Sequence, residues 1–322
     1  MQFLDYSVNL RQEMEELRKR ALLIFNPIAG EKRSLRLMPE VIKRMTESGY
    51  ICTALTTTGR GSATEIAAEH GAENDVIVCS GGDGTANEVI RGMMQIPHEN
   101  RPLFGYIPTG STNDFADALE IPTDVNEIID NITEGDIVPI DTGLFNDRYY
   151  AYVCAFGAFT DASYSTSQLQ KNIWGSLAYF IKGISSIKDI KPIRARFTLD
   201  NKEVVEDDFV FCSISNSKII GGIIRLNPGW VDMNDGKFEI LLIKYPKNGV
   251  ELGKIVNAIT TRELKSCELI RIFSASDILV ESLGEKNIDW SLDGEGETDV
   301  KTAHVINMHS SIRTFVNRQN RM

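Results

Sequence analysis

The chain lacks several features that would place it in common classes of protein. Among its 322 residues, no uninterrupted apolar run approaches the roughly 20 residues that a membrane-spanning helix needs, and the N-terminus has no signal-peptide core. The formal net charge of −11 argues against a nucleic-acid-binding protein and against a broad electrostatic membrane anchor, since both usually carry a basic excess. We therefore expect a cytoplasmic protein with no transmembrane segment and no nucleic-acid partner.

Cysteine and histidine are also scarce. The five cysteines are widely spaced and form no C-x-x-C pair, and the four histidines show no metal-ligand spacing. Three of the cysteines lie in apolar, strand-like runs, so reduced core thiols explain them better than disulfides or zinc ligands. With 42% hydrophobic residues the chain can bury a large core, and its length favours two domains.

The most informative segment joins an apolar run, 76–80, to a glycine-rich turn and then to a predicted helix over 86–94. The turn is Gly81, Gly82, Asp83, Gly84 and Thr85, with Asn87 and Glu88 shortly after it. Glycines let the backbone approach a polyphosphate, and free N–H groups with the helix dipole favour the anion. Asp83 would hold Mg²⁺ or its water shell. An ordinary strand-to-helix turn is the alternative, although this motif is much rarer than a lone G-x-G-x-x-G.

Two more apolar runs end in similar turns. Residues 21–25 lead into Asn26-Pro27-Ile28-Ala29-Gly30, and residues 103–107 lead into Pro-Thr-Gly-Ser-Thr-Asn-Asp-Phe at 108–115. Together with the glycine-rich turn, these motifs resemble the bacterial diacylglycerol kinase and lipid kinase family, which is related to NAD kinases and 6-phosphofructokinases. The family's threonine is Ser111 here, which keeps a hydroxyl. The resemblance covers the chain from Ala21 onward.

The chain is expected to form two domains after a solvated N-terminal extension, 1–20. Strands and helices alternate over 21–141, which predicts a doubly wound parallel sheet, an α/β domain that 305–322 would complete. The resemblance implies a fold like that of phosphofructokinases and NAD kinases. The predicted helices in this part are 35–48, 62–70, 86–94, 114–119 and 126–133.

Short strands and turn signals over 142–304 predict a β-sandwich domain that would hold the lipid acceptor. The turns are expected at 146–147, 200–201, 234–236 and 293–294. Two helical insertions are expected at 168–186 and 248–263. Apolar residues at helical spacing over 173–187 fit either core packing or an interfacial helix beside a lipid pocket.

Ligands of open α/β sheets bind beyond the carboxyl ends of the strands, so a nucleotide should lie across the three turns. ATP and Mg²⁺ are the cofactors that the resemblance implies. The expected contacts are Asn26, Pro27, Gly30, Thr57, Gly81, Gly82, Asp83, Gly84, Thr85, Asn87, Glu88, Ser111 and Thr112. Either Lys32 or Arg33 would supply a cation to the phosphates.

Phosphoryl transfer to an alcohol also needs a base for the hydroxyl proton. From the pattern alone, Asp293-Gly294 between strand-like runs is a hairpin turn. The resemblance implies instead that Asp293 is the general base, with Glu295 holding metal or assisting it.

A second Asp-Gly pair, Asp235-Gly236, is again a hairpin turn by pattern. The resemblance implies a Mg²⁺ site there, built from the Asp235 side chain and the backbone carbonyls of Asp232 and Lys237. Hard cations prefer such oxygen-only ligand sets. The site would be structural or allosteric.

The motifs together predict an ATP- and Mg²⁺-dependent lipid kinase that phosphorylates a lipid alcohol, with diacylglycerol and phosphatidate as the expected substrate and product. Its substrate would be met at a membrane surface, to which the enzyme binds transiently. An NAD kinase and a non-catalytic nucleotide-binding regulatory protein are the alternatives. A homodimer is expected only from the frequency of twofold assemblies.

Overall fold

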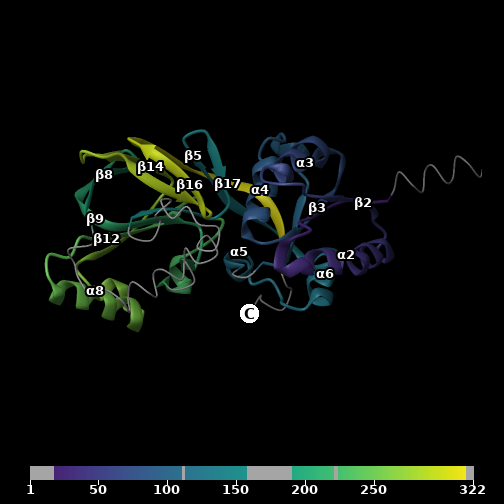
Figure 1. The fold of residues 1–322 in the computed structure, drawn as a ribbon, viewed down its shortest axis with the longest axis horizontal. Helices are drawn as coiled ribbons and strands as arrows, with labels where there is room; N and C mark the ends of the chain where they lie inside the picture. The colour runs from purple at the N-terminus through teal and green to yellow at the C-terminus, as the bar shows by residue number, and fades with distance from the viewer. Residues whose placement is uncertain (1–17, 111–112, 158–190, 221–223, 317–322) are drawn as a thin grey trace, which may run out of the picture. The chain divides into compact units, whose positions relative to one another are not determined.

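The computed structural model describes residues 18–110, 113–157, 191–220 and 224–316 (Figure 1). The described residues fall into two compact units. Unit 1 comprises 18–110, 120–138 and 313–316, and unit 2 comprises 113–119 and the described part of 139–312. Residues 113–119, 139–141 and 305–312, which we expected in the first domain, cluster with unit 2.

Unit 1 is built on parallel strands, as the alternation of strands and helices predicts. They run in the order β2-β1-β3-β4, and Thr314 of β17 pairs in parallel with Phe104 of β4. The strands are β1 (Arg20–Phe25), β2 (Ile51–Thr56), β3 (Val76–Gly81), β4 (Leu103–Pro108) and β17 (Thr302–Val316). Helices α3 and α4 lie on one side of this sheet and α2 and α6 on the other (Figure 1). The prediction of a doubly wound α/β fold is confirmed.

The helices of the α/β region follow the predicted pattern with shifted ends. They are α2 (Ala29–Glu47), α3 (Ser62–His70), α4 (Asp83–Met93), α5 (Asp114–Ala118, in unit 2) and α6 (Val125–Glu134). Helix α4 begins three residues before the predicted start at Ala86, since its first turn is Asp83-Gly84-Thr85 and carries no apolar periodicity. The side chain of Asp124 caps α6 by accepting from the backbone amides of Asn126 and Glu127.

Unit 2 is β-rich, as predicted. Its strands are β5 (Asp136–Phe145), β6 (Arg148–Tyr150), β7 (Val153–Gly157), β8 (Ile193–Leu199), β9 (Glu203–Ser215), β10 (Ile219–Ile220), β11 (Ile224–Arg225), β12 (Phe238–Lys244), β13 (Ile270–Ala275), β14 (Asp277–Ser282), β15 (Ile288–Leu292) and β16 (Glu295–Val300). The main path is β16-β15-β7-β9-β8-β14-β17, and β12 pairs with β9 and β13. Each of the four expected turns contains residues with left-handed φ, from Asn146 to Gly294.

The two helical insertions expected in unit 2 have different outcomes. The second is helix α8 (Gly249–Thr261), which the side chain of Asn248 caps. The first, 168–186, lies outside the described residues. Within the described part of the chain, no helix is long and apolar enough to span a membrane.

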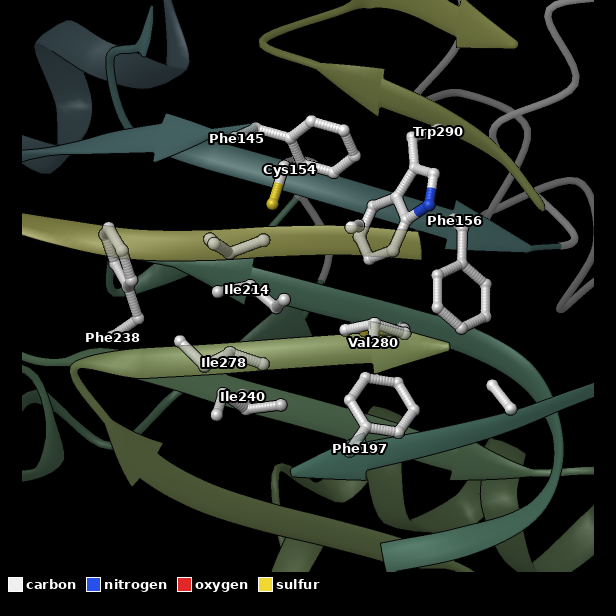
Figure 2. Close-up of a cluster of buried hydrophobic side chains, with 14 of the residues drawn as sticks. Phe145, Cys154, Phe156, Phe197, Ile214, Phe238, Ile240, Ile278, Val280 and Trp290 are labelled. Atoms are coloured by element: carbon white, nitrogen blue, oxygen red, sulfur yellow. The ribbon is translucent and has the colours of Figure 1, made fainter. Parts of the chain in front are cut away.

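Alternate residues along the unit 2 strands pack into two apolar clusters. In the first, Phe156 and Trp290 meet edge to face with ring centroids 4.8 Å apart, among Phe145, Cys154 and Phe197 (Figure 2). The second contains Ala155, Phe211, Leu241 and Ile243 together with Ile255 of α8. Cys154 of β7 lies in the first cluster and Ala155 in the second, so β7 contributes to both. The five cysteines are free, as predicted.

Candidate functional site

The glycine-rich turn of unit 1 joins the buried strand β3 to helix α4. A side chain at Gly81 would place its Cβ 2.5 Å from Cβ of Thr85, so glycine is required by the packing of this turn. Gly82 has its Cβ position 3.3 Å from Cα of Gly110. At Gly84, by contrast, a Cβ would meet nothing within 4 Å and the residue is exposed. The protein itself therefore gives no reason for glycine at position 84.

Asparagine 26 connects the turn after β1 to the glycine-rich turn. Its Nδ2 donates to Oγ1 of Thr85 at 2.9 Å, and its Oδ1 accepts from the amide of Ile28 at 3.2 Å. The backbone amide of Asn26 also donates to the carbonyl of Ser80 at 2.9 Å. The two turns are thus tied by both side-chain and backbone hydrogen bonds.

Gly30 connects the same turn to the end of β4. Its φ of +55° is left-handed, and an added Cβ would lie 1.9 Å from the carbonyl oxygen of Thr109. The amide of Thr109 donates to the carbonyl of Gly81 at 2.8 Å. All three strand-end turns, which we expected to share one ligand, therefore contact one another within unit 1.

Residues Gly30, Glu31 and Lys32 all adopt left-handed backbone conformations, so the helical turns of α2 continue only beyond them. This is consistent with the predicted helix start at 35. Lys32 and Arg33, the two candidate cations, are exposed. Among the described residues, neither makes an ion pair or a side-chain hydrogen bond, so both are available to an anion.

Three further residues that we expected to contact the nucleotide, Thr57, Asp83 and Glu88, also belong to unit 1. Thr57 follows β2 and donates its amide to the carbonyl of Phe25 at 2.9 Å. Asp83 begins α4. Glu88 is buried, and its carboxylate accepts from the amides of Gly61 at 2.8 Å and Ala63 at 3.2 Å, at the start of α3. Glu88 thus holds α3 against α4, a structural task that the motif did not indicate.

Two buried polar atoms in this region have no hydrogen-bond partner within the described part of the chain. They are Oδ1 of Asn87 and Oγ1 of Thr109, both on residues 1% exposed. Buried polar atoms are normally satisfied, so a ligand or water is expected there. Thr109 was not singled out from the sequence, although it directly follows the third strand. Ser111 and Thr112 lie outside the described residues.

In unit 2, Asp293 occupies the β15–β16 turn with a left-handed φ of 48° and is 6% exposed. Its Oδ1 accepts from the amides of Tyr152 at 3.1 Å and Val153 at 2.9 Å, and its Oδ2 accepts from the amide of Ala151. Three backbone donors hold the carboxylate in one position.

Glu295, the proposed helper of Asp293, pairs with Arg148. A second nitrogen of that guanidinium lies 2.9 Å from Glu297. The sequence did not indicate Arg148, which is 147 residues away from Glu295. The arrangement gives Glu295 a fixed position within unit 2 and a cation that offsets its charge.

The loop before β12 contains the residues expected to bind a second Mg²⁺. Asp235 and Asp232 are exposed, and one oxygen of each accepts from a backbone amide two residues on, that of Lys237 at 2.9 Å and that of Asn234 at 3.0 Å. Each carboxylate keeps its other oxygen, and with backbone carbonyls these form an oxygen-only donor set that fits a hard cation. The described residues contain no cluster of three acidic, histidine or cysteine side chains placed for a metal. A cation here would therefore depend on backbone oxygens and water.

Asp141 holds this loop in place through hydrogen bonds. Its buried carboxylate accepts from the amides of Gly236 at 2.8 Å and Ser310 at 2.7 Å, and pairs with Nδ1 of His309 at 3.0 Å. Glu239 follows the loop at the start of β12. Its pKa is raised to about 8, mainly by burial and further by the nearby carboxylates of Asp235 and Asp232.

Comparison with known proteins agrees with these motifs. The family model for the diacylglycerol kinase catalytic domain matches residues 20–145. A protein of Staphylococcus saprophyticus named diacylglycerol kinase is 34% identical over 301 residues, which is 93% of this chain and 96% of that protein. One of Staphylococcus aureus with the same name is 33% identical over 302 residues, 93% of each chain.

Solved structures share the fold. A crystal structure of a Bacillus anthracis protein described as a diacylglycerol kinase has a TM-score of 0.76 and 23% identity, covering 94% of this chain and 98% of its own. Another structure from the same organism has a TM-score of 0.79 at 23% identity, with 94% and 99% coverage. The fold of this chain is therefore a known one.

Proposed function

The chain belongs to the diacylglycerol kinase family and is a lipid kinase, and from this premise we propose that it transfers the γ-phosphate of ATP to the hydroxyl of a lipid alcohol. Diacylglycerol is the proposed acceptor and phosphatidate the product. The observation that carries the nucleotide assignment is the contact among three strand-end turns, through Asn26 with Thr85 and Gly30 with Thr109. The chain would meet its substrate at a membrane surface.

In this proposal the phosphates lie against the start of α4. The exposed backbone at Gly84 and the first-turn amides of α4 face the anion, and the helix dipole favours it. Lys32 or Arg33 adds positive charge. Asp83 would hold Mg²⁺ or its water shell, and bound Mg²⁺ offsets the negative charge that develops during transfer. Asp235, with the carbonyls of Asp232 and Lys237, would hold a second, structural Mg²⁺.

Asp293 is the proposed general base. The acceptor oxygen forms a bond to the γ-phosphorus while the bond from that phosphorus to the bridging oxygen of ADP breaks, and the hydroxyl proton passes to the carboxylate of Asp293. Its three backbone donors hold the carboxylate in place for this step. Glu295, neutralised by Arg148, supports the turn that carries Asp293.

Transfer of labelled γ-phosphate from ATP tests this function. The acceptors are diacylglycerol, undecaprenol, a sphingoid base and NAD, each with Mg²⁺, and Asp293→Ala runs in parallel. Label in diacylglycerol that vanishes in the variant is the expected result. Label in NAD would contradict it. Binding of ATP without any product would favour a regulatory protein that kept the turns without turnover.

A further inference from the structure

Unit 2 contains a group of buried polar side chains that the proposed reaction does not use. Glu239 of β12 is 2% exposed, and Ser213 and Ser215 of β9 are fully buried. Within the described part of the chain, neither carboxyl oxygen of Glu239 and neither serine hydroxyl has a hydrogen-bond partner. Buried polar groups are normally hydrogen-bonded, so four such atoms together call for a partner that the described residues do not supply.

The register of the sheet places these side chains together. Glu239 is directly opposite Ser215, and Leu241 is opposite Ser213, in the antiparallel pair of β12 and β9. Opposite residues point to the same face with Cβ atoms about 4.5–5.5 Å apart. Ile214 and Ile240, the intervening residues, lie in the first apolar cluster (Figure 2). The polar group therefore occupies the opposite face of the sheet.

The same face becomes apolar immediately beyond the polar group. Leu241 and Ile243 follow Glu239 on β12, and Phe211 and Ala155 flank them on β9 and β7, all within the second apolar cluster. Hydrogen-bonding groups thus lie at one end of a buried apolar layer, which also includes Ile255 of α8. This pattern matches a molecule with a polar head and an apolar body.

Val153 of β7 lies between the polar group and the proposed base. Ser215 is opposite Val153 of β7, and the amide of Val153 donates to Oδ1 of Asp293 at 2.9 Å. Neighbouring strands are about 4.8 Å apart, so Ser215 and Asp293 are about two strand spacings from each other, roughly 10 Å between backbones. The register thus places the polar group and Asp293 in neighbouring parts of the same sheet.

The donor and acceptor types select the chemistry of that headgroup. Serine hydroxyls can donate to ester carbonyls, and the carboxyl group of Glu239 can accept from a hydroxyl. An anionic group presents acceptors only and would leave the carboxyl oxygens of Glu239 without a donor. An ammonium group presents donors only and leaves the serine hydrogens without acceptors. A neutral glycerolipid offers both hydroxyl and ester oxygens.

We propose that Ser213, Ser215 and Glu239 form a headgroup subsite that binds a second oxygen of a neutral glycerolipid acceptor. The subsite distinguishes such acceptors from long-chain alcohols with a single oxygen. This inference depends on the proposed lipid kinase function and names the part of the acceptor that unit 2 recognises. A site built to hydrogen-bond a substrate group discriminates strongly against an analogue without that group.

The test compares kcat/KM for dioctanoylglycerol with kcat/KM for farnesol in mixed micelles. The variants are Ser213→Ala/Ser215→Ala and Glu239→Met, which removes both carboxyl oxygens and keeps the length of the side chain. Ser274→Ala, an exposed serine opposite Glu239 on β13, is the matched control. We expect the double serine variant to lower the diacylglycerol preference about tenfold or more, mainly through KM, which corresponds to about 1.4 kcal/mol. Ser274→Ala should leave the preference unchanged.

Thermal unfolding of each variant shows whether it is folded under the assay conditions. If the double serine variant unfolds at the assay temperature, Glu239→Met alone decides, and its diacylglycerol preference should also fall. Equal losses on both alcohols, or an unchanged preference in folded variants, overturn the subsite and leave the lipid kinase function standing. If the wild-type protein phosphorylates diacylglycerol no better than farnesol, the subsite is also wrong. Absence of transfer to any lipid alcohol would overturn the proposed function and the subsite together.

Discussion

Asp293 and Val153 exchange two hydrogen bonds: the amide of Val153 donates to Oδ1 of Asp293, and the amide of Asp293 donates to the carbonyl of Val153, each at 2.9 Å. This reciprocal pair fixes the β15–β16 turn against the start of β7. Any group that Asp293 serves is therefore met by a carboxylate with little freedom to move.

Replacing that carboxylate should abolish chemistry without abolishing nucleotide binding. Asp293→Asn removes the proton acceptor, and we expect kcat to fall about 10²–10⁴-fold while the affinity for ATP stays within about twofold. Steady-state kinetics and equilibrium nucleotide binding measure the two quantities. Because the amide nitrogen of asparagine cannot accept from a backbone N–H, assays should run well below the variant's melting temperature. Retention of kcat within threefold would remove Asp293 from the reaction.

The two glycines at positions 30 and 84 should respond differently to alanine. Gly30→Ala places a Cβ against the carbonyl of Thr109 and demands a left-handed backbone, so we expect a loss of more than about 2 kcal/mol in the free energy of unfolding. Gly84→Ala meets no protein atom and should keep or slightly raise stability. It should nonetheless weaken ATP binding about tenfold, since the backbone there must approach phosphate. Unchanged ATP affinity in Gly84→Ala would contradict the phosphate turn.

Glu88 should matter more for stability than for the nucleotide. The Gly61 and Ala63 amides donate to different oxygens of Glu88, and Glu88→Gln replaces one of these two acceptors with an NH2 donor, so the free energy of unfolding should fall by about 1 kcal/mol. Denaturant unfolding measures this change. The KM for ATP should stay within about twofold, measured on the folded variant. A much larger rise in KM with unchanged stability would instead make Glu88 a ligand of the nucleotide or its metal.

Arg148 and Glu295 should act as one unit. Glu295→Gln and Arg148→Met each break the ion pair, and we expect both to reduce kcat by similar factors, with the double variant no worse than either. The double-mutant cycle in unfolding free energy should give a coupling of about 1 kcal/mol. Glu295 would have a direct chemical role if its single variant lost far more activity than Arg148→Met.

Acid should weaken the β8–β9 turn through Asp200. Burial disfavours the charged form of this carboxylate, but hydrogen bonds from the amides of Asp277 and Ser276 outweigh it and hold the pKa below its ordinary value of 3.8. Stability from this group is therefore present above that value and is lost as pH falls through the lower, folded pKa. The gap in unfolding free energy between wild type and Asp200→Asn, about 1 kcal/mol at pH 7, should close in strong acid. Urea unfolding of both proteins at several pH values measures this difference in unfolding free energy. A difference that stays constant with pH would show that the charge of Asp200 contributes nothing.

The sequence predicted the parts of this fold that depend on neighbouring residues. Helix α3 has the predicted bounds, 62–70, and the apolar runs before the three turns are strands β1, β3 and β4. Left-handed residues at Asp200, Gly236 and Asp293 occur where Asp-Gly and Asp-Asn pairs predict turns. These features follow from periodicity and turn chemistry, which are local properties of the chain.

Features that join distant residues were missed. No local pattern links Glu295 to Arg148, 147 residues earlier, or Glu88 to the start of α3. The assignment of residues 113–119 to unit 2 likewise depends on contacts such as the stacking of Phe115 on Tyr152. Pairing across sequence separations of this size is set by the sheet topology, and a single sequence gives no periodic signal for it.

Strand β17 contributes residues to both units, and this constrains the order in which the units can fold during synthesis. Thr314 donates to the carbonyl of Phe104 across 210 residues, and Arg313 donates to the carbonyl of Arg101. The edge of β4 therefore stays unpaired on that side until the segment about 210 residues later has left the ribosome. Unit 1 is completed only after the strands of unit 2 have been made, so the nascent chain exposes an open strand edge while those residues are translated, and such an edge can pair with other chains and aggregate.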